Sequence, residues 1–305
     1  MRTTRDAATV TSSPPVTGKP RHYRSGIRPR RVVGVVGLAA VAAAVTGTVV
    51  TLEQGGARSS PALCTVTSPT STYTLVPDQA ANAATIGAVA GQLGLPDHAV
   101  TVALATAMQE SKLRNVNYGD RDSIGLFQQR PSQGWGTADQ IIQPSYAAAA
   151  FYGALAKIPG WETLDVAVAA QRVQRSADGT AYTRWEDEAR ALAVALTGQQ
   201  PAKLACSGGD VTYHRSAAAV AAEVGTALGP TALSAGVPAV TAWKTATYLV
   251  ANAYADGVTS VSYGGQTWTA KRGTWRADPG PVAVANTQVT FTVATPPSPA
   301  GAAGR

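Results

Sequence analysis

Residues 105–136 read ATAMQESKLRNVNYGDRDSIGLFQQRPSQGWG, and the fold class follows from this stretch. It opens as the second half of a helix that begins near Asp97, with apolar residues at helical spacing, and Glu110 and Ser111 come at its end. Residues 115–137 then contain many Gly, Asn, Asp, Pro and Ser, which predicts a long irregular loop or a short hairpin. Long structured loops inside compact domains are often functional, so we expect the chemistry of this protein here.

Helical patterns surround this stretch and set the class of the domain. The predicted helices lie at about 78–93, 144–157, 164–175, 180–197, 216–228 and 239–256. Two later segments, VTSVSYGGQTWTA and TQVTFTVAT, alternate apolar and polar residues beside a Gly264-Gly265 turn, which predicts short strands. The sequence therefore predicts a mainly α domain over 76–207, a small α+β domain over 208–295 and a disordered tail over 296–305.

The start of the chain differs from the rest in charge and hydropathy. Residues 1–31 contain eight basic residues against one acidic residue, and the remainder is balanced, which argues against a nucleic-acid partner. Residues 32–52 carry no charge over about twenty residues, the length that spans a bilayer core. The positive-inside rule then predicts a cytoplasmic tail over 1–31, one transmembrane helix over 32–52 and an extracytoplasmic chain over 53–305. The apolar segment is either a membrane anchor or a cleaved signal, in which case the protein is secreted.

The chain has two cysteines, Cys64 and Cys206, and the predicted topology places both outside the cytoplasm. An even count in an oxidising compartment predicts a disulfide, and the alternative is two buried free thiols. Residues 53–75, which include Cys64, are rich in Ser, Thr, Gly and Pro and predict a linker.

Glu110 is the strongest candidate for a catalytic residue. Cleavage of a glycosidic bond needs an acid that protonates the leaving oxygen, and this acid must hold its proton near neutral pH. Burial beside Met108 and Leu104 and the C-terminal end of a helix would both favour the protonated form of Glu110. The alternative is that Glu110 only caps the helix or pairs with Lys112 or Arg114.

Other side chains of the loop and of the following helices extend the candidate site. Asp120 and Asp122 are candidates for a second carboxylate, as an inverting hydrolase needs, or are turn residues in a Gly-Asp-Arg-Asp loop. Aromatic side chains that either stack on sugars or belong to the core are Tyr118, Trp135, Tyr152 and Trp161. The three histidines, His22, His98 and His214, have no metal-ligand spacing, and no phosphate-binding motif occurs, so we expect no metal and no cofactor.

Two short motifs give a resemblance to a known family. Glu110-Ser111 and, some fifteen residues on, Gly125-Leu126-Phe127-Gln128 resemble the two leading signatures of the lysozyme-like, soluble lytic transglycosylase family, with Phe127 where the family has Met. The segments ESKLRN, YGDRDS and GLFQQRPSQGWG are still more similar to an actinobacterial, membrane-anchored group of this superfamily. The resemblance covers residues 97–197, about a third of the chain.

The resemblance implies a lysozyme-like domain in which Glu110 acts as acid and then as base on the β-1,4 link of peptidoglycan. It implies a sugar cleft with Gln128 and a Tyr from the later helices. The family's third signature, Ala-Tyr-Asn-x-Gly, has no clear match, and Ala181-Tyr182 is the nearest candidate. The substrate-binding residues expected are Ser111, Tyr118, Gln128, Trp135 and Tyr182. With no second carboxylate, a one-acid mechanism with a 1,6-anhydro product is favoured.

The sequence thus predicts a single-pass cell-membrane protein whose external domain cleaves peptidoglycan strands. The main alternative is a non-catalytic peptidoglycan-binding wall protein with the same fold. A membrane transporter or regulator is disfavoured because one span does not form a translocation path. The last domain faintly resembles one from other actinobacterial wall proteins that ends in Asp-His-x-His, but Gln288 and Thr290 stand where His would, so we expect a binding or packing module.

Overall fold

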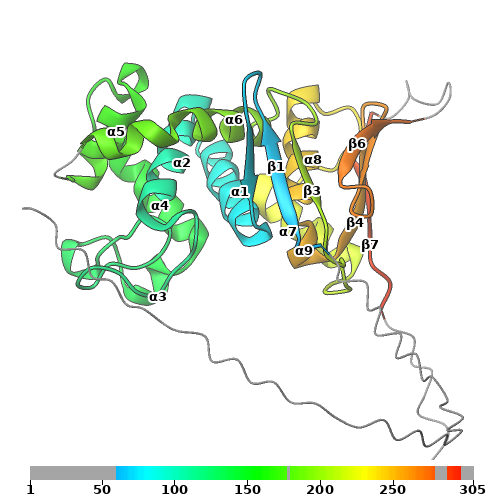
Figure 1. Cartoon of the computed structure of the whole chain (residues 1–305), viewed down its shortest axis with the longest axis horizontal. Helices are drawn as coiled ribbons and strands as arrows, with labels where there is room; N and C mark the ends of the chain where they lie inside the picture. Colours follow the sequence, from blue (N-terminus) through cyan, green and yellow to red (C-terminus); the bar gives the residue numbers. More distant parts are fainter. Residues whose placement is uncertain (1–59, 177–178, 279–286, 297–305) are drawn as a thin grey trace, which may run out of the picture. The chain divides into compact units, whose positions relative to one another are not determined.

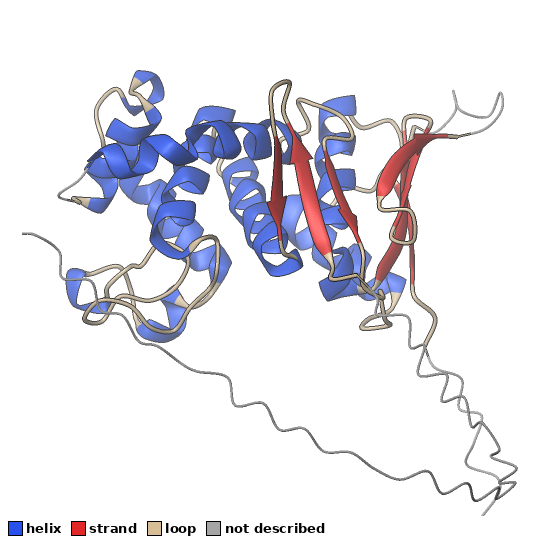
Figure 2. Cartoon of the chain, viewed as in Figure 1, coloured by secondary structure: helices blue, strands red, loops and turns tan. Residues whose placement is uncertain are grey.

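The computed structural model describes residues 60–176, 179–278 and 287–296. These residues form a mixed fold of many helices and two small antiparallel sheets (Figures 1 and 2). The elements are β1 (Leu63–Thr67), β2 (Thr72–Leu75), α1 (Pro77–Gln92), α2 (Asp97–Ser111), η1 (Pro131–Gln133), α3 (Ala138–Ile141), α4 (Pro144–Leu155), η2 (Trp161–Thr163), α5 (Val166–Gln174), η3 (Gly179–Trp185), α6 (Glu186–Leu196), β3 (Leu204–Ser207), α7 (Ala217–Leu228), α8 (Ala239–Ala251), α9 (Ala253–Asp256), β4 (Val258–Tyr263), β5 (Gln266–Thr269), β6 (Thr274–Ala277) and β7 (Thr290–Val293), where η marks a 3₁₀ helix.

The predicted basic tail over 1–31, the predicted transmembrane helix over 32–52 and nearly all of the predicted tail over 296–305 lie outside the described residues. Within the ranges given above, none of the helices has the length and apolar character that crossing a membrane requires.

The predicted linker over 53–75 is wrong for residues 63–75, which form an antiparallel β-hairpin. Polar residues dominate this segment, but Cys64, Val66 and Leu75 alternate with them and point into the core. β1 also pairs with β3, so the order of this first sheet is β2-β1-β3. The hairpin therefore belongs to the folded unit.

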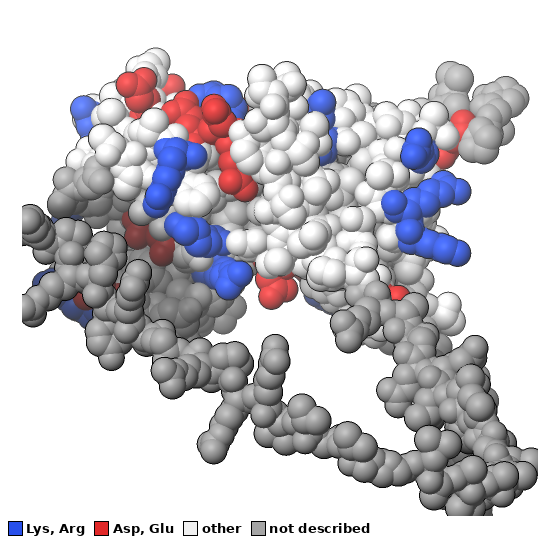
Figure 3. Space-filling view, in the orientation of Figure 1, with Lys and Arg blue, Asp and Glu red and all other residues white. Residues whose placement is uncertain are grey.

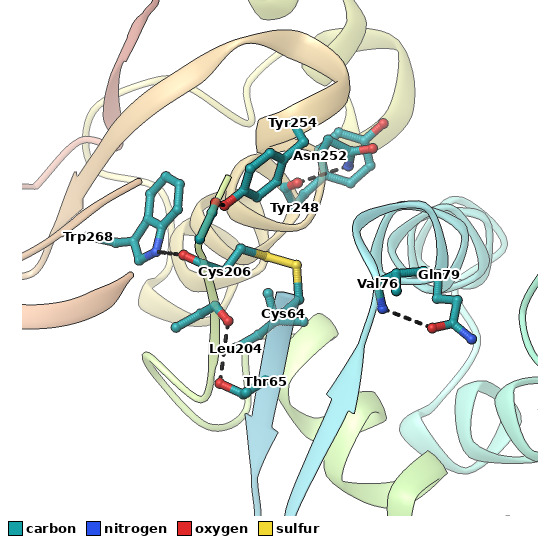
Figure 4. Close-up of a disulfide and its surroundings, with 12 residues drawn as sticks. Cys64, Thr65, Val76, Gln79, Leu204, Cys206, Tyr248, Asn252, Tyr254 and Trp268 are labelled. Carbon is teal, nitrogen blue, oxygen red and sulfur yellow. Dashed lines mark hydrogen bonds between the residues drawn. A yellow bond between two sulfur atoms is a disulfide. The ribbon is translucent and has the colours of Figure 1, made fainter. Parts of the chain in front are cut away.

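Cys64 and Cys206 face each other across β1 and β3 and form a fully buried disulfide (Figure 4). This confirms the predicted bond and excludes the alternative of free thiols. The indole of Trp268 donates to the carbonyl of Cys206 at 3.0 Å, and the indole of Trp275 donates to that of Leu204 at 2.9 Å. β3 is thus joined to the first sheet by its backbone and to the second sheet by two tryptophans.

The helices confirm most of the periodic patterns of the sequence. α2 is buried along nearly its whole length and packs against α6, α5 and α4, while α1 packs between α4 and α8. Four of the ten buried residues of α2 are alanines, and such small side chains allow neighbouring helices to approach closely. The predicted helix over 180–197 begins as η3, and the one over 239–256 is interrupted at Asn252.

The second sheet has the order β6-β5-β4-β7, with the predicted turn at Gly264-Gly265, where both residues have positive φ. α8 packs against β4 and also against β3. The described residues cluster as one compact unit, so the predicted domains over 76–207 and 208–295 share one core. Gln288 donates to the carbonyl of Leu233 at 2.7 Å, which ties the start of the last strand to the loop before α8.

Candidate functional site

Glu110 lies one residue before the end of α2 and is half-buried. The hydroxyl of Tyr182, the one buried residue of η3, donates to Glu110 Oε1 at 2.9 Å. Lys112 donates instead to the carbonyls of Met108 and Gln109, and no cation of the described ranges lies within ion-pair distance of Glu110. The alternative that Glu110 pairs with Lys112 or Arg114 is therefore wrong.

The chain reverses sharply after Glu110, which brings the following loop back over the end of α2. Lys112 and Leu113 have φ of 58° and 57°, and their amides donate to the carbonyls of Met108 and Ala107. Left-handed residues that close the last helical turn in this way are a common helix ending. The hydroxyl of Ser111 lies 3.1 Å from the carbonyl of Ala107 and 2.8 Å from that of Leu126. Ser111 therefore ties α2 to the loop rather than presenting a free hydroxyl.

The loop segment from Gly125 to Gln128 is a tight turn beside Glu110. Gly125 has φ of 76°, and a Cβ there would lie 2.9 Å from the carbonyl of Ile141, so only glycine fits. Gln128 also has positive φ, and its amide donates to the carbonyls of Tyr118 and Gly125. From the end of α5, Gln174 donates to the carbonyl of Phe127 at 2.8 Å. Side-chain amides on both sides thus hold the turn.

Two hollows meet at this turn, because Glu110 and Gln128 line both of them. The first, of about 690 Å³, lies between the end of α2, β2 and the start of α6. The second, of about 1000 Å³, lies between the loop, α4 and the end of α5. Together they form a groove with Glu110 near its middle. Charged side chains gather over the helices on one side of the molecule and over the second sheet on the other, and the surface over the β1–β2 hairpin is mostly uncharged (Figure 3).

The four predicted stacking aromatics separate into two groups. Tyr118, 71% exposed, lines the first hollow, and Trp135 lines the second. Tyr152 is buried and donates to the carbonyl of Ile86, and Trp161 is buried in a stack on His98. Tyr152 and Trp161 are therefore core residues, and stacking on a sugar by either of them is excluded.

The two candidate second carboxylates also differ. Asp122 accepts from the guanidinium of Arg130 and from the amide and hydroxyl of Ser132, which together hold the pKa of Asp122 well below its usual value. It lines neither hollow, and so it acts as a turn residue that fixes the loop. Asp120 is exposed, lies 3.9 Å from Arg121 and lines the second hollow. Of the pair, Asp120 alone reaches the groove.

Several groove residues were not predicted from the sequence. Glu188, on the first turn of α6, lines the first hollow, and burial raises its pKa. Gln109 accepts from Arg184 at 2.8 Å and from the indole of Trp185 at 2.9 Å, and Lys112 lies 4.4 Å above the Trp185 ring. Acidic residues are common in the first turn of any helix, so no local pattern distinguishes Glu188 from them.

Neither a metal-binding group nor a matching protein family identifies this site further. Across the described ranges, no three His, Cys, Asp or Glu side chains form a group that could hold a metal ion. His98 stacks on Trp161 and His214 contacts Thr212, while His22 lies outside these ranges. Comparison of the sequence with protein-family models and with curated proteins gives no match.

The arrangement is suited to proton transfer. A half-buried carboxyl group with one oxygen held by a tyrosine, in the middle of a long groove, can give a proton to a bound ligand and take one back.

Proposed function

We propose that this chain cleaves the β-1,4 bond between MurNAc and GlcNAc in peptidoglycan, with Glu110 as acid and then base in a lysozyme-like domain. The observation that carries the proposal is the position of Glu110, hydrogen-bonded to Tyr182 where the two hollows meet. A glycan strand that runs through both hollows would cross Glu110 with sugars on either side. The chain would act as a membrane-anchored lytic transglycosylase facing the wall, or as a secreted one if the apolar segment is cleaved. The buried disulfide supports an oxidising compartment.

The contact with Tyr182 suggests which oxygen of Glu110 carries the proton. Because Oε1 accepts from Tyr182, a protonated Glu110 holds its proton on Oε2. Oε2 then protonates the glycosidic oxygen as the bond to C1 of MurNAc breaks and positive charge develops on that sugar. The carboxylate next takes the proton from the 6-hydroxyl of the same sugar, whose oxygen attacks C1. The products are a free GlcNAc 4-hydroxyl and a 1,6-anhydro-MurNAc end, and no other reactant is consumed.

Of the two carboxylates that the sequence offered to a hydrolase, Asp122 is removed by its contacts. Asp122 is engaged by Arg130 and Ser132, so it is not free to activate water. Asp120 and Glu188 line opposite halves of the groove. Each would be the second carboxylate of a hydrolase if water, activated by it, replaced the 6-hydroxyl as the nucleophile. The alternative function is a non-catalytic wall-binding protein, which would use the same groove and the exposed Tyr118 without turnover.

The test compares the full-length wild-type chain with Glu110→Gln on purified peptidoglycan, with the released fragments identified by mass spectrometry. We expect anhydro-muropeptides from the wild type and a rate lower by about 10²–10⁴-fold from the variant, since the amide supplies no proton. Glu162→Gln, an exposed carboxylate outside both hollows, is the matched control and should keep full activity.

Other outcomes of this experiment would support a hydrolase or a wall-binding protein instead. Reducing ends from the wild type would reject the transglycosylase and direct attention to Asp120 and Glu188. If neither chain releases fragments but both bind the wall equally, the wall-binding alternative replaces the enzyme.

A further inference from the structure

The second hollow is strongly basic. Arg130, Lys157, Arg172 and Arg175 line it, and its acidic residues are Asp120 and the shared Glu110. The first hollow has two cations, Lys112 and Arg114, and two carboxylates, Glu110 and Glu188. Cationic side chains are therefore concentrated in one half of the groove.

Three of the four cations in the second hollow form no ion pair with a described carboxylate. Arg130 is engaged with Asp122 at 2.8 Å. Lys157, Arg172 and Arg175 are exposed, and none forms an ion pair with a carboxylate of the described residues. They come from the turn after α4 and from the end of α5, which converge on the same hollow. Their charges are available to a ligand.

A bare glycan gives these cations little to bind. The sugars carry hydroxyl and N-acetyl groups, and the lactyl group of MurNAc is an amide wherever a peptide stem is attached. The stems themselves carry carboxylates. Guanidinium groups bind carboxylates through paired, charge-assisted hydrogen bonds, so the charge and the donor geometry of this hollow match a stem rather than a sugar.

We propose that the second hollow is a subsite for the carboxylates of the peptide stem, formed by Lys157, Arg172 and Arg175. The inference rests on the proposed function, because it takes the groove to hold a peptidoglycan strand. It implies that stem-bearing strands are the preferred substrate. The neutral wall of the hollow contains Trp135, whose carbonyl accepts from Tyr146, and this wall is left for the apolar part of the stem or for a sugar face.

The experiment measures binding by calorimetry in the full-length chain with Glu110→Gln, so that turnover does not consume the ligand. The test variant adds Lys157→Gln, Arg172→Gln and Arg175→Gln. The matched control adds Lys271→Gln, Arg272→Gln and Arg276→Gln, which remove the same charge from exposed positions at the β5–β6 turn and on β6. The probes are a disaccharide–peptide, the same compound with its carboxylates converted to amides, and stem-free glycan with a free lactyl carboxylate.

We expect the disaccharide–peptide to bind about tenfold tighter than its amidated form, as a few exposed charge contacts would give. The test variant should lose this difference and the control should keep it. Equal affinity of test and control variants for the disaccharide–peptide would overturn the proposal. Stem-free glycan that binds as tightly, through the same cations, would also overturn it, because the lactyl group would then be the ligand.

Failure of this inference and failure of the proposed function are distinguishable. Cleavage of the wall by the chain with Glu110 intact, together with charge-independent binding, rejects only the stem subsite. Charge-dependent binding without any cleavage rejects the enzyme and leaves the subsite in a wall-binding protein.

Discussion

The contact between Tyr182 and Glu110 joins two residues that lie 72 positions apart in the chain. Tyr182 is 1% exposed and packed in the core, so it is the fixed member of the pair, while Glu110 is half-buried and faces the groove. A packed hydroxyl that holds one carboxyl oxygen restricts the side chain to few orientations. We infer that Tyr182 positions Glu110 rather than contacting a ligand directly.

Replacement of Tyr182 by Phe should therefore lower kcat by about fivefold and leave KM within about twofold, since one hydrogen bond contributes about 1 kcal/mol. The ring still fills the core, so the free energy of unfolding should change by less than about 1.5 kcal/mol. Steady-state kinetics on soluble glycan fragments and urea unfolding measure both. Tyr146→Phe is the control, because it also removes one hydroxyl, 3.2 Å from the carbonyl of Trp135 in the second hollow. Equal effects of the two variants on kcat would contradict the positioning role.

At the scale of elements, the sequence predicted the features that depend on residues close together in the chain, namely the helices and the two short motifs. The periodic patterns located α1, α2, α4 and α7 closely, and the two motifs located Glu110 and the turn at Gln128. β1, β2, β3 and β6 were missed, although β5 and β7, which are no longer than these, were predicted from the alternation of the segments around them. Cys64 and Cys206 pair across 142 positions, and no local pattern reveals such a register. Glu188 was missed for the same reason, because only packing of α6 on α2 brings it to the groove.

The elements α7, α8 and α9 meet at a buried charge. Asp256, at the end of α9, is 2% exposed and lies 2.7 Å from the guanidinium of Arg215, which also pairs with Glu223 of α7. Tyr248 of α8 contacts Glu223. Burial and the charge of Glu223 raise the pKa of Asp256 to about 6, against the opposing effects of Arg215 and His214.

The raised pKa of Asp256 predicts a pH dependence of stability with a definite sign. Its pKa of about 6 in the folded chain exceeds its ordinary value of 3.8, so the folded state holds a proton that the unfolded state releases. This contribution is complete below pH 3.8 and is lost as the pH rises through 6, at a cost of about 3 kcal/mol. Unfolding in urea from pH 4 to 7 should show this fall for the wild type and a flatter curve for Asp256→Asn. A curve for Asp256→Asn as steep as that for Asp210→Asn, an exposed control, would refute this assignment.

At the scale of the whole described chain, β3 connects two parts that the sequence predicted as separate domains. Its backbone pairs with β1, its residues accept from Trp268 and Trp275, and α8 packs against it. The hydrophobic core is continuous across this region. The composition changes near 207, and the sequence suggested a boundary there, but composition carries no information on how the two parts pack.

The disulfide makes the strongest prediction at this scale, because it fixes β1 to β3 and so fixes the hairpin whose β2 lines the first hollow. The double variant Cys64→Ala/Cys206→Ala should lose about 3–5 kcal/mol of the free energy of unfolding, the value expected for a loop of 142 residues. Urea unfolding measures this, and a reductant should destabilise the wild type equally while leaving the variant unchanged. Where the reduced chain is still folded, affinity for glycan should fall as well, since Thr74 and Leu75 of β2 would be less firmly held. Full stability and full affinity after reduction would mean that the main-chain pairing of β1 with β3 is sufficient, and that the bond serves neither the fold nor the groove.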